Sequence, residues 1–95
     1  MTLEIWQPNR HPAFVYPEMT LRIQAPEPFR LRWTINDWQT TNHSISTETP
    51  LGISFVDIPI SKTQRAPIRF GFFWTSSGKD EDRNYAVEVL TGKHP

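Results

Sequence analysis

A period-two alternation of apolar and polar residues constrains the fold of this chain more than any other feature. It is clearest at residues 29–35, where Phe29, Leu31, Trp33 and Ile35 alternate with polar side chains. Successive side chains of a β-strand point to opposite faces of a sheet, so the alternation predicts a strand with one buried face. No segment shows the period of about 3.6 residues that marks an amphipathic helix. We therefore predict an all-β protein.

The densest aromatic run, residues 67–75, has the same alternation and predicts the first strand of a β-hairpin. Residues 82–89 predict the second strand. The polar stretch between them, residues 76–82, contains Gly78 and is predicted to form the turn. The apolar positions in phase are Ile68, Phe70, Phe72 and Trp74 in the first strand, and Tyr85, Val87 and Val89 in the second.

Shorter segments of the same kind lie upstream of this hairpin. Strands are predicted at residues 3–6, 13–16, 19–25 and 51–60, separated by turns that are polar or contain proline. Residues 42–50 are almost entirely polar and are predicted to form a loop or an edge strand. The chain therefore consists of many short strands.

These strands define the predicted fold. A chain of 95 residues forms one domain, so we predict a single domain over residues 1–95. Turn signals recur at intervals of about 8–12 residues, as in a β-sandwich. We predict an immunoglobulin-like antiparallel β-sandwich of about seven strands. Its predicted core contains Leu21, Ile23, Leu31, Trp33, Phe55, Phe70, Phe72, Tyr85 and Val87.

Charge and composition exclude several functions. The formal net charge is zero, so no overall field attracts nucleic acid or an acidic membrane. The absence of cysteine excludes disulfides and thiolate metal sites. No apolar run approaches the roughly 20 residues of a membrane span, and the first residues do not resemble a secretory signal. We expect a cytoplasmic protein with neither nucleic acid nor membrane as its partner.

The residues that most often carry catalysis are not grouped in the sequence. His11, His43 and His94 are far apart and lack metal-ligand spacing. The acidic residues 80–82 are predicted to be the solvated tip of the hairpin rather than a pair of catalytic carboxylates. We therefore predict no enzymatic activity, no metal and no cofactor.

The arginines on the predicted strands have two interpretations. Arg22, Arg30, Arg32 and Arg69 all occupy outward positions. They would suit a basic stripe that follows a nucleic-acid backbone. Because acidic residues balance them, we favour ordinary solvated sheet faces.

Trp38 differs from the other tryptophans in its setting. Trp33 and Trp74 lie in the apolar phase of their strands, which predicts core packing for both. Trp38 follows a strand break and lies among Asn36, Asp37 and Gln39. It is either a plug over one end of the sandwich or a platform for a ligand. Sugar rings stack their C–H faces on indole while amides and carboxylates bind their hydroxyls, so the platform interpretation predicts a carbohydrate.

Two motifs resemble those of starch-binding carbohydrate-binding modules. Residues 32–40, Arg-Trp-Thr-Ile-Asn-Asp-Trp-Gln-Thr, resemble an early motif in which a strand runs into an Asp-Gly-Trp-type turn. Residues 73–87 resemble a closing motif with an aromatic-Trp pair, an Asp/Asn-rich turn and an Asn-Tyr-x-Val strand. A similar arrangement closes the C-terminal β-sandwich of some bacterial glucoamylase-like proteins. The resemblance extends over residues 20–90.

The resemblance implies an immunoglobulin-like sandwich that binds α-1,4-glucans, namely starch, glycogen or maltooligosaccharides, without catalysis. By position, its ligand-binding residues are Trp38, Trp74, Asp82 and Asn84, which are expected to lie close together. The chain departs from the pattern, because the turn lacks the usual glycine and residues 79–81 replace an expected Trp or Asn.

A second hypothesis follows from these departures. It is an immunoglobulin-like protein-interaction domain on a scaffold that has lost its sugar site. Phe73 and the outward arginines would then contact a protein partner or form a weak homodimer, since aromatic residues and arginine are enriched at interfaces.

Overall fold

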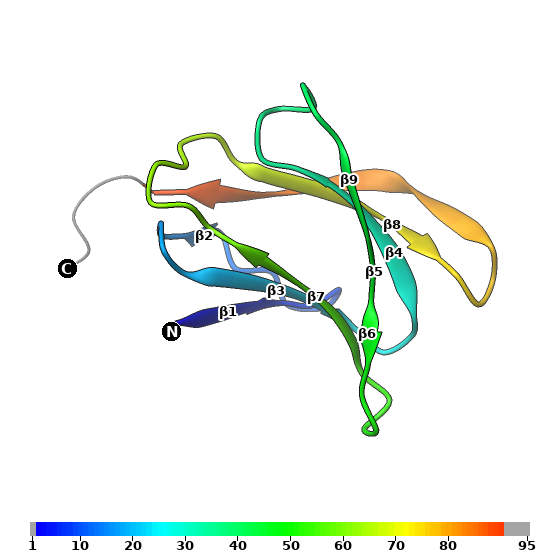
Figure 1. Ribbon diagram of the computed structural model, residues 1–95. Helices are drawn as coiled ribbons and strands as arrows, with labels where there is room; N and C mark the ends of the chain where they lie inside the picture. The colour runs from blue at the N-terminus through cyan, green and yellow to red at the C-terminus, as the bar shows by residue number, and fades with distance from the viewer. Residues whose placement is uncertain (1, 91–95) are drawn as a thin grey trace.

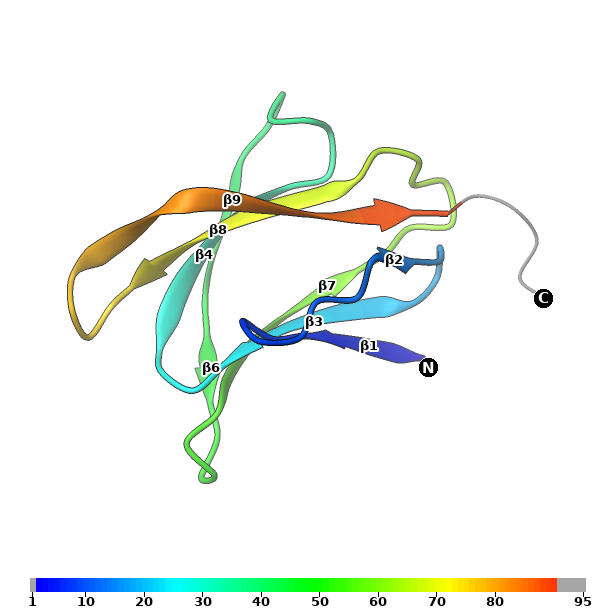
Figure 2. The same cartoon turned by 180° about the vertical axis from the view of Figure 1, so that it is seen from behind.

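The computed structural model describes residues 2–90, and this part of the chain forms nine β-strands and no helix. The strands form two sheets that pack face to face (Figures 1 and 2). The predicted all-β sandwich is confirmed. The strands are β1 (Leu3–Trp6), β2 (Phe14–Val15), β3 (Thr20–Ala25), β4 (Phe29–Thr34), β5 (Asn42–Ile45), β6 (Thr47–Glu48), β7 (Ser54–Pro59), β8 (Ile68–Trp74) and β9 (Lys79–Val89).

Both sheets are mixed rather than purely antiparallel. The first has the strand order β1-β3-β7-β6, and the second has the order β2-β9-β8-β4-β5. The two short N-terminal strands pair in parallel, β1 with β3 and β2 with β9, whereas every other neighbouring pair is antiparallel as predicted. The finer prediction of an immunoglobulin-like strand order stays a prediction.

The core lies between the two sheets as one apolar cluster. Its largest side chains, Trp6, Phe29, Phe70 and Phe72, are at most 1% exposed. The predicted core residues Leu21, Ile23, Leu31, Phe70, Phe72 and Val87 are buried. Trp33 and Tyr85 are partly buried and pack against the cluster. The period-two alternation therefore identified the inward face of β3, β4, β8 and β9.

Phe55 is a correction to the predicted core. Strand β7 buries Ser54, Val56 and Ile58, so Phe55 points outward. The segment carries apolar residues in both phases, and burial of Val56 and Ile58 in the core sets the phase of the strand. The outward Phe55 ring is covered by Arg22, whose guanidinium carbon lies 4.1 Å from the ring centroid.

The polar stretch after β8 is the second correction. Only residues 75–78 form the turn, in which Gly78 has a φ of +68°, and β9 begins at Lys79. A bulge lies opposite Phe72, because Gly71 pairs with Asn84 whereas Phe73 pairs with Asp80. Three β9 residues therefore lie opposite one β8 residue. This irregular pairing extends the strand through a sequence that is typical of a turn.

Residues 42–50, predicted to be a loop or an edge strand, contain two edge strands. β5 pairs with β4 in one sheet, and β6 pairs with β7 in the other. The chain changes sheet at Ser46, which binds Phe29 through both its N–H and its hydroxyl. This polar segment therefore borders both sheets.

Candidate functional site

A compact loop, residues 35–41, covers the outer side of β4 where that strand ends. Thr34 lies in the outward phase but is fully buried beneath this loop. Its hydroxyl oxygen accepts hydrogen bonds from the N–H groups of Asn36 (3.2 Å) and Trp38 (3.1 Å). It donates to the carbonyl of Thr40 at 2.7 Å. One buried threonine therefore organises the loop.

The backbone of this loop is left-handed at two consecutive residues. Asp37 has a φ of 57° and Trp38 has a φ of 67°. Asp tolerates this region, but it is uncommon for a bulky residue such as Trp. Asn36 holds the turn closed, because its side chain exchanges hydrogen bonds with the N–H and hydroxyl of Thr40. The loop thus contains no glycine, although its left-handed conformation usually favours glycine.

Arg32 connects this loop to a distant strand. Its guanidinium carbon lies 5.9 Å from the centroid of the Trp38 ring. One guanidinium nitrogen donates to the side-chain oxygen of Asn84 at 3.1 Å. A second lies 3.7 Å from a carboxylate oxygen of Asp80. Residues far apart in the sequence therefore meet around one arginine on the outer side of the sheet.

Gly71 makes room for this arrangement. It pairs with Arg32 on one side and with Asn84 on the other. A Cβ at this position would lie 2.5 Å from an Arg32 nitrogen and 2.9 Å from the Asn84 side-chain oxygen. We call the surface formed by Arg32, Trp38, Gly71, Asp80 and Asn84 the Arg32 face.

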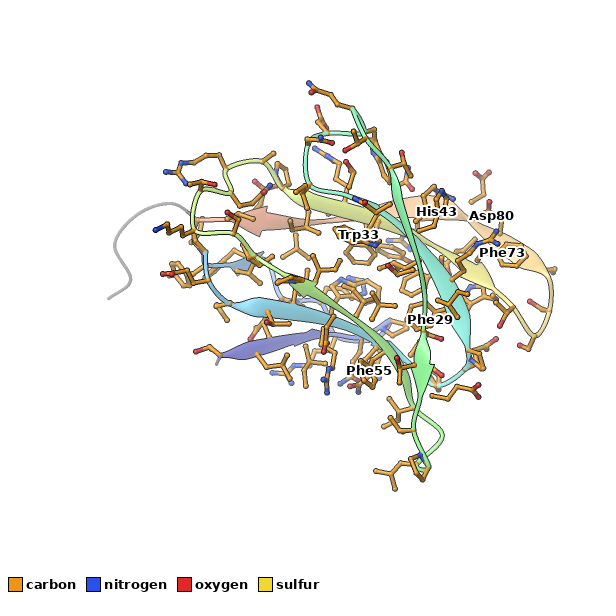
Figure 3. The ribbon with its side chains drawn as sticks, viewed as in Figure 1. Phe29, Trp33, His43, Phe55, Phe73 and Asp80 are labelled. Carbon is orange, nitrogen blue, oxygen red and sulfur yellow. The ribbon has the colours of Figure 1, made fainter. Side chains whose placement is uncertain are left out.

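The neighbouring arginines are also engaged. Arg69 forms an ion pair with Asp37, with 3.1 Å between Nε and the carboxylate oxygen. The guanidinium carbon of Arg30 lies 4.7 Å from the centroid of the Phe73 ring. Phe73 and Asp80 lie on the outer side of the sheet, whereas Phe29 and Trp33 point into the space between the sheets (Figure 3). The outward arginines thus bind acidic or aromatic neighbours while remaining partly exposed.

Trp74 lies on the opposite face of β8 from Gly71. Its ring stacks on Phe72, with 4.8 Å between centroids and 2° between planes. Its indole N–H donates to Glu81 at 2.9 Å, and Glu81 also accepts the hydroxyl of Tyr85. Burial, followed by the hydrogen bond and charge of Glu81, raises the pKa of Tyr85 above its usual value. Glu81 is therefore bound to two aromatic side chains and is not part of a solvated tip.

The four predicted ligand residues thus do not form one cluster. Trp38 and Asn84 meet through Arg32, but Trp74 faces the interior on the other side of the sheet. Asp82 is an exposed residue of the β9 bulge, and no hydrogen bond joins it to either tryptophan among the described residues. Sequence reasoning placed Arg32 among the outward arginines but assigned neither it nor Gly71 nor Asp80 to the sugar site. Only the β4–β8–β9 register brings them together.

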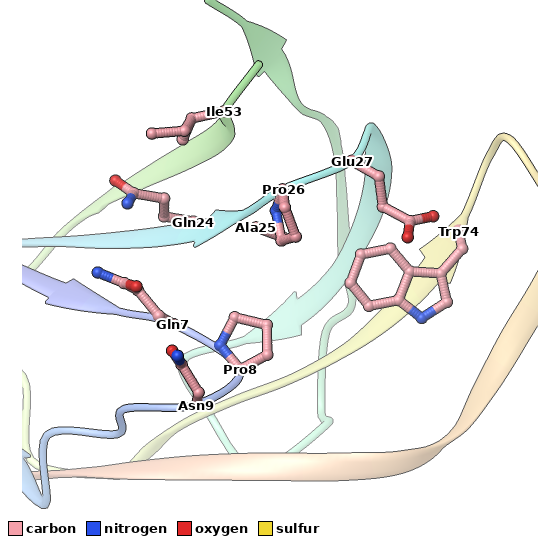
Figure 4. Close-up of a pocket in the computed structure, with 9 residues that line it drawn as sticks. All are labelled: Gln7, Pro8, Asn9, Gln24, Ala25, Pro26, Glu27, Ile53 and Trp74. Atoms are coloured by element: carbon pink, nitrogen blue, oxygen red, sulfur yellow. The ribbon is translucent and has the colours of Figure 1, made fainter. Parts of the chain in front are cut away.

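A cleft of about 580 Å³ lies at the end of the sandwich near Trp74 (Figure 4). It is separate from the Arg32 face, since no member of that face lines it. Over residues 2–90, no group of three or more acidic or histidine side chains is placed to hold a metal ion. The same residues include no helix that is long and apolar enough to cross a membrane. No protein-family model, curated protein or solved structure matches the chain.

Proposed function

We propose that this domain binds an α-1,4-glucan at the Arg32 face without catalysing its cleavage. The observation that carries the proposal is the contact of Arg32 with both Trp38 and Asn84. These residues come from the two motifs that resemble starch-binding modules, and the fold brings them onto one surface. Trp74 is not part of this proposed site.

The chemistry of the face suits a sugar chain. The Trp38 indole offers an apolar surface for the C–H face of a glucose ring. Arg32 supplies hydrogen-bond donors, Asp80 supplies acceptors and the Asn84 amide supplies both. Because the residues lie on an open sheet surface rather than in a closed pocket, they favour an extended polymer over a small enclosed ligand.

The carboxylates near Trp38 support binding rather than hydrolysis. Glycoside hydrolysis generally requires two carboxyl groups on either side of the scissile bond, one of them acting as an acid. Asp80 and Asp37 are each paired with an arginine. In the proposed site both carboxylates serve to position side chains.

Affinity electrophoresis in native gels that contain glycogen tests the proposal. We expect glycogen to slow migration of the protein, and we expect Trp38→Ala to abolish the retardation. Gln39→Ala, an exposed neighbour in the same loop, is the matched control and should migrate as the parent protein does. Equal migration of the parent protein with and without glycogen would contradict the proposal.

The Arg30–Phe73 contact favours a second candidate, a protein-interaction surface on the same outer side of the sheet. Sedimentation velocity distinguishes a homodimer from a monomer. Under this alternative the protein self-associates at high concentration and Phe73→Ala reduces that association. The glucan proposal requires neither result.

A further inference from the structure

The cleft near Trp74 has a size and a lining that suit a small ligand. It lies between the turn that follows β1, the end of β3 with its following turn, and the Trp74 ring (Figure 4). Its volume of about 580 Å³ is within the range typical of small-ligand sites. The site is built from four separate segments of the chain, residues 7–9, residues 24–27, Ile53 and Trp74, which the sandwich core holds together.

Trp74 is fixed in the wall of this cleft. Phe72 stacks on the ring, and the centroid of the Phe29 ring lies 6.0 Å from the centroid of the Trp74 ring. Glu81 accepts a hydrogen bond from the indole N–H. The part of the ring that lines the cleft is consequently held in place before any ligand binds. A fixed aromatic wall binds a ring at low cost in side-chain conformational entropy.

Three carboxamides line the cleft across from Trp74, those of Gln7, Asn9 and Gln24 (Figure 4). Within residues 2–90, none of these side chains has a hydrogen-bond partner in the protein. Each amide can donate and accept, which matches the hydroxyl groups of a sugar.

The charge of the residues that line the cleft also limits which ligands can bind there. Glu27 is the charged residue in it, and one of its oxygens accepts the hydroxyl of Ser76 at 3.1 Å. No lysine, arginine or histidine is among the lining residues, so nothing there compensates an anionic ligand. Pro8 and Pro26 add apolar surface beside the indole. A proline-rich peptide fits less well, because it docks in grooves lined by several aromatic residues and Trp74 is the single aromatic in this lining.

We infer that the Trp74 cleft is a second ligand site, which takes the end of a neutral oligosaccharide. One sugar ring lies against Trp74, and its hydroxyls bind the carboxamides of Gln7, Asn9 and Gln24. This inference is independent of the glucan proposal, because the two sites share no residue and lie on opposite sides of β8.

NMR of the ¹⁵N-labelled full chain tests the inference. The probes are maltohexaose, cellohexaose, xylohexaose and chitohexaose, with a hexaproline peptide as the competing class. We expect at least one oligosaccharide to shift the Trp74 indole signal and the side-chain amide signals of Gln7, Asn9 and Gln24. The shifts should persist in Trp38→Ala, which separates this site from the Arg32 face.

Two variants test where the oligosaccharide binds without altering the packing of Trp74. Asn9→Ala removes an exposed amide of the cleft and should weaken binding about tenfold, measured as the dissociation constant from the titration. Gln39→Ala removes an exposed amide elsewhere and should leave binding unchanged. The inference is overturned if no oligosaccharide shifts these signals at millimolar concentration. It is also overturned if only the peptide does, or if Trp38→Ala abolishes the shifts.

Discussion

Trp38 and Trp74 are held in place by different means. Trp38 is positioned by its backbone, through a left-handed turn fixed on Thr34, and its ring contacts Arg32. Trp74 is positioned by its side chain, through stacking on Phe72 and the hydrogen bond to Glu81. The first is an outward residue on a hydrogen-bonded loop, and the second belongs to the edge of the core. An aromatic residue in a recognisable motif thus gains its role from the face on which strand phase and turn geometry place it.

Removal of the Phe72 ring, on which Trp74 stacks, should have the largest effect on stability. Phe72 is 1% exposed and contacts Trp6, Phe29, Phe70, Trp74 and Tyr85. Phe72→Ala should reduce the free energy of unfolding by about 3–5 kcal/mol, the usual cost of emptying a buried phenylalanine site. Urea denaturation measures the change. An unchanged midpoint would show that the ring does not support the core.

Glu81 and Asp82 are adjacent carboxylates with different surroundings. Glu81→Ala leaves the Trp74 N–H and the Tyr85 hydroxyl without their partner, and should destabilise the fold by about 1–3 kcal/mol. Asp82→Ala is the matched control and should stay within about 0.5 kcal/mol, as for an exposed residue. Urea midpoints of both variants make the comparison. Equal effects would contradict the placement of Glu81 against the two rings.

Tyr85, on the Trp74 side of the sheet, makes the stability of the fold depend on pH. Because its pKa is higher in the folded protein than in the unfolded chain, the neutral hydroxyl stabilises the fold at neutral pH. This contribution is lost as the pH rises above the ordinary tyrosine value of about 10. We expect urea midpoints of the parent protein to fall more steeply between neutral and strongly alkaline pH than those of Tyr85→Phe. Parallel profiles would contradict the raised pKa that burial and Glu81 together give Tyr85.

Gly71→Ala tests whether glucan binding depends on the position of Arg32. The added methyl group would meet the end of the flexible Arg32 side chain at 2.5 Å, so Arg32 must move while the strand remains intact. We expect a stability change of less than about 1 kcal/mol together with weaker glucan binding. Isothermal titration with maltoheptaose measures the binding. Unchanged affinity would show that the position of Arg32 does not matter to the site.

The sequence predicted the strands more successfully than the surfaces they create. The alternation at residues 29–35 and 67–75 identified strands with the correct inward face, because one phase there is clearly more apolar. At Phe55 both phases are apolar, so local pattern alone could not choose between them. Glu81 belongs to a polar run typical of a turn, and only the bulge directs it towards Trp74. The contact of Arg32 with Asn84 depends on pairing across three strands, which local pattern does not encode.

Trp38→Ala tests the central claim most directly, that the Arg32 face binds a glucan through an outward tryptophan. Urea denaturation and maltoheptaose titration are performed side by side, with Gln39→Ala as the control from the same loop. We expect stability within about 0.5 kcal/mol of the parent protein, as for a surface change, and loss of glucan binding. A loss of about 3 kcal/mol or more would instead identify Trp38 as a structural plug. A variant that still binds maltoheptaose with the parent affinity would contradict the claim.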